Sequence, residues 1–70
     1  MKNKEEVINS VSDELTELTD KIKSLKDFIN SDLFEEIEDI QQELLIMQYD
    51  SMLDYQSCLV ARIKNLKKGN

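Results

Sequence analysis

The chain has 70 residues, with 15 acidic and 9 basic side chains, a formal net charge of -6, no histidine and one cysteine. This length predicts one small domain over residues 1–70 with a limited core. A single Cys58 excludes an intrachain disulfide, and no cluster of His and Cys exists for a structural metal, so association is the remaining route to stability. The acidic balance argues against partners such as nucleic acid or an anionic membrane, and no apolar run is long enough to span a bilayer.

The first predicted element is a helix near residues 8–30. Its apolar positions are separated by alternating steps of three and four residues, which is the spacing of one helical face. The residues between them are almost all polar, so this face is narrow and the rest of the helix is expected to face water. The apolar face comprises Ile8, Val11, Leu15, Leu18, Ile22, Leu25 and Ile29.

A break is predicted after the first helix, with a short turn or helix over residues 31–38. Asn30, Ser31 and Asp32 favour turns and helix caps, because their short side chains bond nearby backbone groups. Asp32 with Glu35, and Asp39 with Gln42, have the spacing of a capping box. These patterns predict a short helical turn before a second long helix near residues 39–67.

The second helix carries two apolar rows that lie about 100° apart. One partner helix cannot cover both rows, so we expect an antiparallel two-helix hairpin that assembles as a homo-oligomeric all-α bundle through the second helix. The first row is Leu45, Met52, Leu59 and Leu66, and the polar residues interleaved with it are Gln48, Tyr55 and Arg62. The second row is Ile46, Tyr49, Leu53, Val60 and Ile63.

The interleaved polar residues are the most unusual feature of the pattern, because buried polar groups must be hydrogen-bonded and a buried charge needs a partner. One interpretation is structural: Gln48 sets the register of an oligomer, Tyr55 packs in its core and Arg62 pairs with a carboxylate. The other interpretation is a ligand site, in which Arg62 grips a phosphate, Tyr55 stacks on a base and Gln48 bonds a base edge or a ribose hydroxyl. Periodicity leaves both open.

Catalysis is poorly supported by the residues present. The chain has no histidine to act as a general base, no Ser or Cys beside a plausible base, and no glycine-rich phosphate loop. The acidic run from Glu35 to Asp39 is expected to be a solvated helix start, not a metal site. The sequence therefore predicts a protein that is not an enzyme and that holds no cofactor or metal.

Two stretches resemble a widespread set of very small phage proteins, first labelled after a crAss-like phage gene product. The similarity covers roughly residues 14 to 64, and the chain departs from the pattern at Ile37, where leucine is expected. The matching stretches are Leu25-x-x-Phe28-Ile29-x-Ser31-x-x-Phe34 and Leu44-Leu45-x-x-Gln48-x-x-x-Met52-x-x-Tyr55-x-x-x-Leu59-x-x-Arg62-Ile63.

The resemblance implies a phage gene product that acts in the cytoplasm of an infected bacterium. The leading expectation is an anti-defence sponge that sequesters a nucleotide immune signal, of the cyclic ADP-ribose type or a cyclic dinucleotide, without cleaving it. The expected ligand-binding residues are Gln48, Tyr55, Arg62 and Phe34. The alternatives are a protein-binding inhibitor of a defence complex, such as an anti-CRISPR, and a purely structural or regulatory hairpin.

Overall fold

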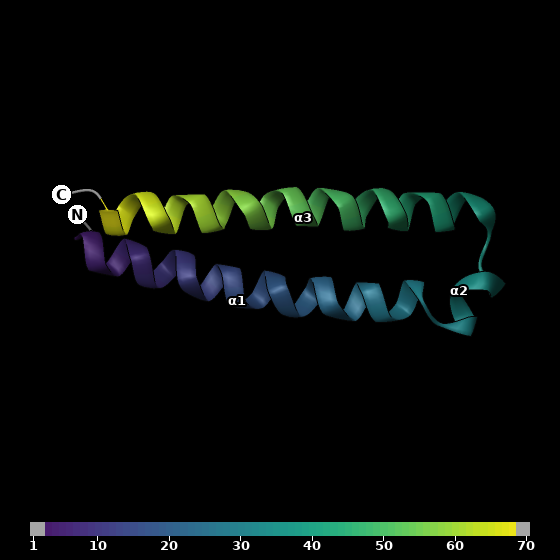
Figure 1. The fold of residues 1–70 in the computed structure, drawn as a ribbon. Helices are drawn as coiled ribbons and strands as arrows, with labels where there is room; N and C mark the ends of the chain where they lie inside the picture. The colour runs from purple at the N-terminus through teal and green to yellow at the C-terminus, as the bar shows by residue number, and fades with distance from the viewer. Residues whose placement is uncertain (1–2, 69–70) are drawn as a thin grey trace.

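The computed structural model describes residues 3–68, which form three helices: α1 (Lys4–Ile29), α2 (Asp32–Glu36) and α3 (Asp39–Lys68). Residues 1–2 and 69–70, which the single-domain prediction includes, lie outside this described part. Figure 1 shows α1 and α3 side by side and antiparallel, with α2 at one end and both termini at the other. The prediction of an all-helical hairpin is confirmed, and α1 begins at Lys4, earlier than the expected start near residue 8.

Local hydrogen bonds define the two ends of α1. The side chain of Asn3 accepts a bond from the backbone N–H of Glu6 at 2.8 Å, which satisfies one of the free donors of the first turn. At the other end the N–H of Asn30 donates to the carbonyl of Lys26. The hydroxyl of Ser31 donates to the carbonyl of Phe28 at 2.6 Å, so the polar residues of the predicted break do end the helix.

The predicted capping boxes are wrong in position. Ser31, not Asp32, is the N-cap of α2, and no side-chain bond caps this helix. Asp39 is already the first residue of α3, and Gln42 does not reach back to its N–H. The amide of Gln42 donates instead to the carbonyls of Phe34 at 3.0 Å and Ile37 at 3.1 Å, at the end of α2, where the carbonyl of Phe34 also accepts the N–H of Ile37 at 3.4 Å.

The core is a single layer between α1 and α3. The molecule measures 50 × 19 × 15 Å, so a side chain can be buried only where the two helices face each other. The amide of Gln56 donates to the hydroxyl of Thr19 at 3.1 Å and marks the register of the pair. The buried side chains are Val11, Leu18, Ile22 and Leu59. The half-buried side chains around them are Val7, Leu15, Tyr49, Met52, Leu53, Ile63 and Leu66.

The face that α3 turns toward α1 draws on both predicted rows, which corrects the expectation that α1 would cover one of them. A step of three residues back from Met52 gives Tyr49, and a step of four gives Gln48; these positions flank Met52 on opposite sides of the helix. α1 covers the side of Tyr49 and Ile63. Gln48, Tyr55 and Arg62 are exposed on the other side, so they are not part of the hairpin core.

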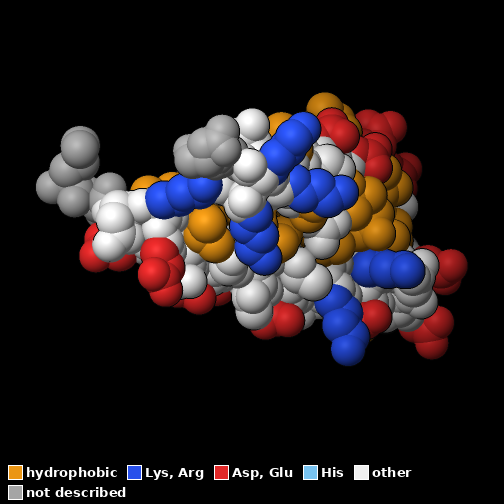
Figure 2. Space-filling model, turned by 60° about the vertical axis from the view of Figure 1, so that its left-hand side comes forward, with side chains coloured by type: hydrophobic (Ala, Val, Ile, Leu, Met, Phe, Trp, Pro, Cys, Tyr) orange, Lys and Arg blue, Asp and Glu red, His pale blue; other side chains and the backbone are white. Residues whose placement is uncertain are grey.

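α3 consequently keeps large apolar side chains in contact with water. Ile40 is 54% exposed, Leu44 47%, Met47 62% and Tyr55 43%, while Ile46 on the opposite flank is 44% exposed. Figure 2 shows hydrophobic side chains that reach the surface of one face between Lys and Arg side chains, with acidic side chains toward its margins. The expectation that one partner helix cannot cover α3 agrees with these exposures.

Candidate functional site

Three of the four predicted ligand-binding residues lie in one line along α3. Gln48, Tyr55 and Arg62 are exposed and follow each other at intervals of seven residues. An α-helix rises by 1.5 Å per residue, so neighbours in this line are about 10 Å apart along the axis and its ends are about 21 Å apart. One chain therefore does not bring these three side chains together around one small ligand.

The fourth predicted residue, Phe34, belongs to α2 and packs on α1. Its ring lies 6.1 Å from the ring of Phe28 in an edge-to-face arrangement at 84°, which is a favourable geometry for two aromatic rings. Phe34 is half-buried, and its backbone carbonyl accepts the bond from Gln42. This contact holds α2 against the end of α1, so the structure gives Phe34 a packing role near the site.

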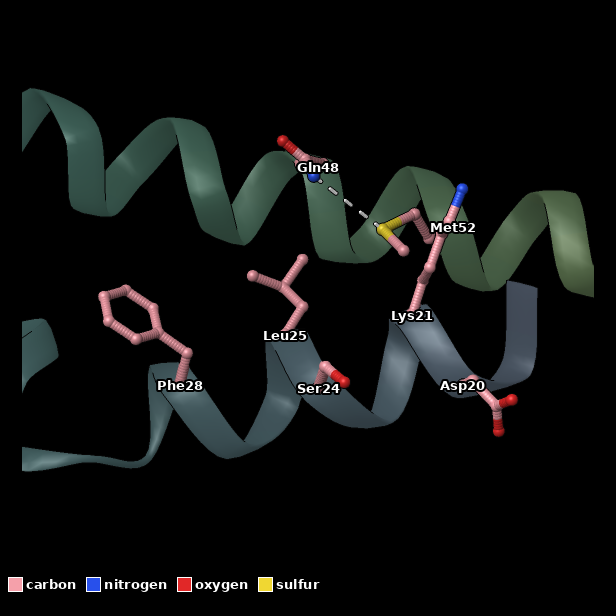
Figure 3. Close-up of a pocket in the computed structure, with 7 residues that line it drawn as sticks. All are labelled: Asp20, Lys21, Ser24, Leu25, Phe28, Gln48 and Met52. Atoms are coloured by element: carbon pink, nitrogen blue, oxygen red, sulfur yellow. Dashed lines mark hydrogen bonds between the residues drawn. The ribbon is translucent and has the colours of Figure 1, made fainter. Parts of the chain in front are cut away.

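A cavity of about 460 Å³ lies between α1 and α3 and contains Gln48 in its wall. Its α1 wall is Asp20, Lys21, Ser24, Leu25 and Phe28, and its α3 wall is Gln48 and Met52. Figure 3 shows Leu25 pointing from α1 toward the space between Gln48 and Met52, and Lys21 reaching across toward Met52. The cavity thus has an apolar floor with an ammonium group at one edge.

The polar side chains at this cavity and along the line of Gln48 and Arg62 make few hydrogen bonds within the described part of the chain. The amide of Gln48 has one contact, a donor interaction with the sulfur of Met52 at 4.0 Å, which is a weak acceptor. Within residues 3–68, neither Lys21 nor Arg62 makes an ion pair or a side-chain hydrogen bond. These donors are therefore available to a ligand, and both cations suit an anionic group.

The acids do not assemble into a metal site in this part of the chain. Across residues 3–68 no three His, Cys, Asp or Glu side chains come close enough to hold a metal ion. No helix in the same range is long and apolar enough to cross a bilayer. Cys58 is exposed, so it does not pack as a small apolar side chain in the hairpin core.

The sequence analysis missed the α1 half of this cavity. Lys21 and Phe28 lie beside the predicted apolar row of α1, of which Leu25 is a member, on the side of the hairpin where Gln48 is exposed. A signal was present, because Leu25 and Phe28 are three residues apart and widen the apolar face toward one side near the end of α1. The pairing of that side with Gln48 depended on the register between the helices, which periodicity does not give.

Comparison with known proteins identifies the family of this chain. Residues 5–65 match the model of the Sequestin family. The chain is also 39% identical over 57 residues to an uncharacterised 7.5 kDa protein encoded in the denB-rIIB intergenic region of Enterobacteria phage T4, an alignment that covers 81% of this chain and 89% of the phage protein. No solved structure is significantly similar to it. The chain therefore belongs to the Sequestin family and is similar to a small phage protein.

Proposed function

We propose that this protein binds a nucleotide-derived anion and sequesters it without cleaving it, as a phage anti-defence protein in the cytoplasm of an infected bacterium. The family name indicates sequestration, and the T4 relative supports a phage origin. The observation that carries the ligand class is the cavity between α1 and α3, where Lys21 and Gln48 border an apolar floor. Its volume of about 460 Å³ is in the range of small-molecule pockets, roughly 300–1,000 Å³, and it is a shallow groove that is largely open to solvent.

The side chains at the cavity fit the parts of a nucleotide. Leu25, Phe28 and Met52 offer a surface on which an adenine ring can lie, since bases bind through their faces to aromatic and apolar groups. Lys21 supplies a cation for phosphate, and the amide of Gln48 both donates and accepts, as a base edge or a ribose hydroxyl requires. None of these groups is a good nucleophile or general base, so the proposed action is binding.

Calorimetry with cyclic ADP-ribose isomers and cyclic dinucleotides tests this proposal. We expect one class to bind, to be recovered chemically intact after the protein is denatured, and to bind less tightly at high salt because surface charges are screened. Lys21→Ala should cost about 1.5–3 kcal/mol, or roughly ten-fold or more in affinity, through lost charge-assisted bonds. Lys23→Ala is the matched control, because Lys23 is an exposed lysine of the same helix that does not line the cavity. Absence of binding across the panel contradicts the proposal.

A second candidate is supported by the charge around α2. Asp32, Glu35, Glu36, Glu38 and Asp39 are all exposed, and the chain has a net charge of -6. Such a surface suits electrostatic attraction to a basic protein of a defence system. Glu36→Lys separates the two candidates, because it reverses a charge in this acidic run and touches no side chain of the cavity. Loss of anti-defence activity in this variant, with nucleotide binding intact, supports the protein-binding inhibitor.

A further inference from the structure

We propose that two copies of the chain pair antiparallel along α3, so that Arg62 of each copy completes the cavity of the other as a shared phosphate site. The pairing surface, called the outer row, comprises Leu44, Gln48, Ser51, Tyr55, Cys58 and Arg62. The assignment of a phosphate ligand rests on the function proposed above, whereas the pairing of the two chains does not depend on that function.

The outer row has the spacing and exposure of a helix interface. Its members follow each other by alternating steps of four and three residues, which is the repeat of a helix that packs along another helix. All of them are exposed to solvent, including Leu44 at 47% and Tyr55 at 43%. By helical geometry no acidic residue belongs to the row: Asp54 lies at its edge, and Glu43 and Asp50 fall farther around α3. A second copy of this row can therefore bury apolar surface without burying a carboxylate.

Charge decides the relative direction of the two copies. A symmetric dimer brings the same surface of both chains together, so α3 helices can pair either parallel or antiparallel. Parallel pairing places the two Arg62 side chains opposite each other, and like charges across an interface are unfavourable. Antiparallel pairing about the middle of the row separates the arginines and places each of them within about one helical turn of Gln48 of the other chain.

The second copy also changes the net charge of the cavity. One chain supplies Lys21 and Asp20, so its cavity carries one cation and one carboxylate. Figure 3 shows Gln48 on the α3 wall and Lys21 reaching toward that wall from α1. The partner's Arg62, placed near Gln48, adds a second cation on this side and complements Asp20. Two cations beside an apolar floor suit a phosphate attached to a base, because guanidinium can hold phosphate with two parallel bonds.

A mixing experiment separates a shared site from a site within one chain. Lys21→Glu and Arg62→Glu each place a carboxylate in every site of a pure dimer, and each should weaken binding of cyclic ADP-ribose or cyclic di-AMP at least ten-fold. When the two variants are refolded together, each mixed dimer regains one site with Lys21 from one chain and Arg62 from the other. About one quarter of the wild-type binding capacity should return, since about half of the randomly formed dimers are mixed.

The control substitutions lie close to Lys21 and Arg62 on the same two helices. Lys23→Glu and Lys64→Glu change the same charge next to these positions without touching the cavity, and a mixture of either with wild type should keep full capacity. No recovery in the mixture of Lys21→Glu with Arg62→Glu, with both variants helical and dimeric, overturns the shared site.

A crosslinking experiment tests the pairing without any ligand. Tyr55 lies in the middle of the outer row, so Tyr55→Cys in a Cys58→Ser background should form a disulfide between copies under mild oxidation. Ser57→Cys in the same background is the control: residue 57 is exposed on the side of α3 opposite Tyr55, so this variant should stay monomeric on a denaturing gel. Equal crosslinking at both positions, or none at residue 55 in a folded protein, overturns the pairing. If no nucleotide of the panel binds but residue 55 crosslinks strongly, the proposed function and the shared phosphate site are both overturned. The interface between copies is then still established.

Discussion

α1 and α3 have comparable lengths, 26 and 30 residues, but different relations to their neighbours. α1 has one narrow apolar face, and the opposing helix covers it, so Val11, Leu18 and Ile22 are buried. α3 has apolar side chains on both sides of its inner face; α1 covers the side of Tyr49 and Ile63, while Leu44 and Tyr55 stay exposed. The difference is that the apolar face of α1 is covered by one helix, whereas α3 presents apolar side chains that no other part of residues 3–68 covers. The candidate site lies where the covered and uncovered parts of α3 meet.

The sharpest way to break the covered face is at its most buried residue. Leu59 is 1% exposed, so Leu59→Ala should destabilise the hairpin by about 2–5 kcal/mol, through lost burial and the cavity left behind. Because the free energy of unfolding of a small domain is only a few kcal/mol, much of the helical circular dichroism signal should be lost. Urea unfolding followed by circular dichroism at fixed protein concentration measures this. Met47→Ala, at a position 62% exposed, is the control and should change stability by less than about 0.5 kcal/mol.

The uncovered side of α3 is tested by Tyr55→Glu. In the paired assembly two carboxylates would meet near the middle of the outer row, and such like charges cost several kcal/mol at an interface. Light scattering should then report the mass of a single chain, whereas we expect the wild type to have the mass of an oligomer at high micromolar concentration. Val60→Glu introduces the same charge on the opposite flank of α3. If Val60→Glu separates the chains and Tyr55→Glu does not, the interface lies on the flank of Ile46 and Val60.

The link between α2 and α3 should contribute less than the core. Gln42→Ala removes the two bonds to the carbonyls of Phe34 and Ile37, and each such bond is worth about 0.5–1.5 kcal/mol. We expect a loss of about 1–2 kcal/mol in the free energy of unfolding, and more motion of α2 in hydrogen exchange. Gln41→Ala is the matched control. Gln41 is exposed, so its substitution should hardly change the free energy of unfolding. An equal effect of both substitutions would assign the loss to helix propensity.

The smallest effect is expected at the bond between the two long helices. Gln56 donates to Thr19 at 3.1 Å on the exposed edge of the interface, where water can replace either partner. Gln56→Ala should therefore cost less than about 1 kcal/mol. A double-mutant cycle with Thr19→Ala isolates the interaction between them. A coupling energy near zero would show that the register is held by the apolar core alone.

The sequence by itself determined the helices and their connection. No proline interrupts the chain, and the alternating spacing from Ile8 to Ile29 leaves no structure other than an amphipathic helix for the first segment. Asn30, Ser31 and Asp32 predicted the break for a local reason, since their side chains compete for backbone groups. The local rules were less successful with the helix caps. The side chain of Gln42 bonds two carbonyls at the end of α2 instead of the backbone N–H that a capping box requires.

Only the tertiary structure decided which side of α3 faces α1. In sequence, Gln48 and Tyr49 flank the same row at steps of four and three residues, and both positions are compatible with one helical face. Packing resolves the choice, since burying Tyr49 and Ile63 stabilises the hairpin, whereas burying Gln48 and Arg62 costs free energy unless each is hydrogen-bonded or paired. The cavity that joins Lys21, Leu25 and Phe28 to Gln48 follows from that choice, because residues on separate helices become neighbours only once the helices are in register.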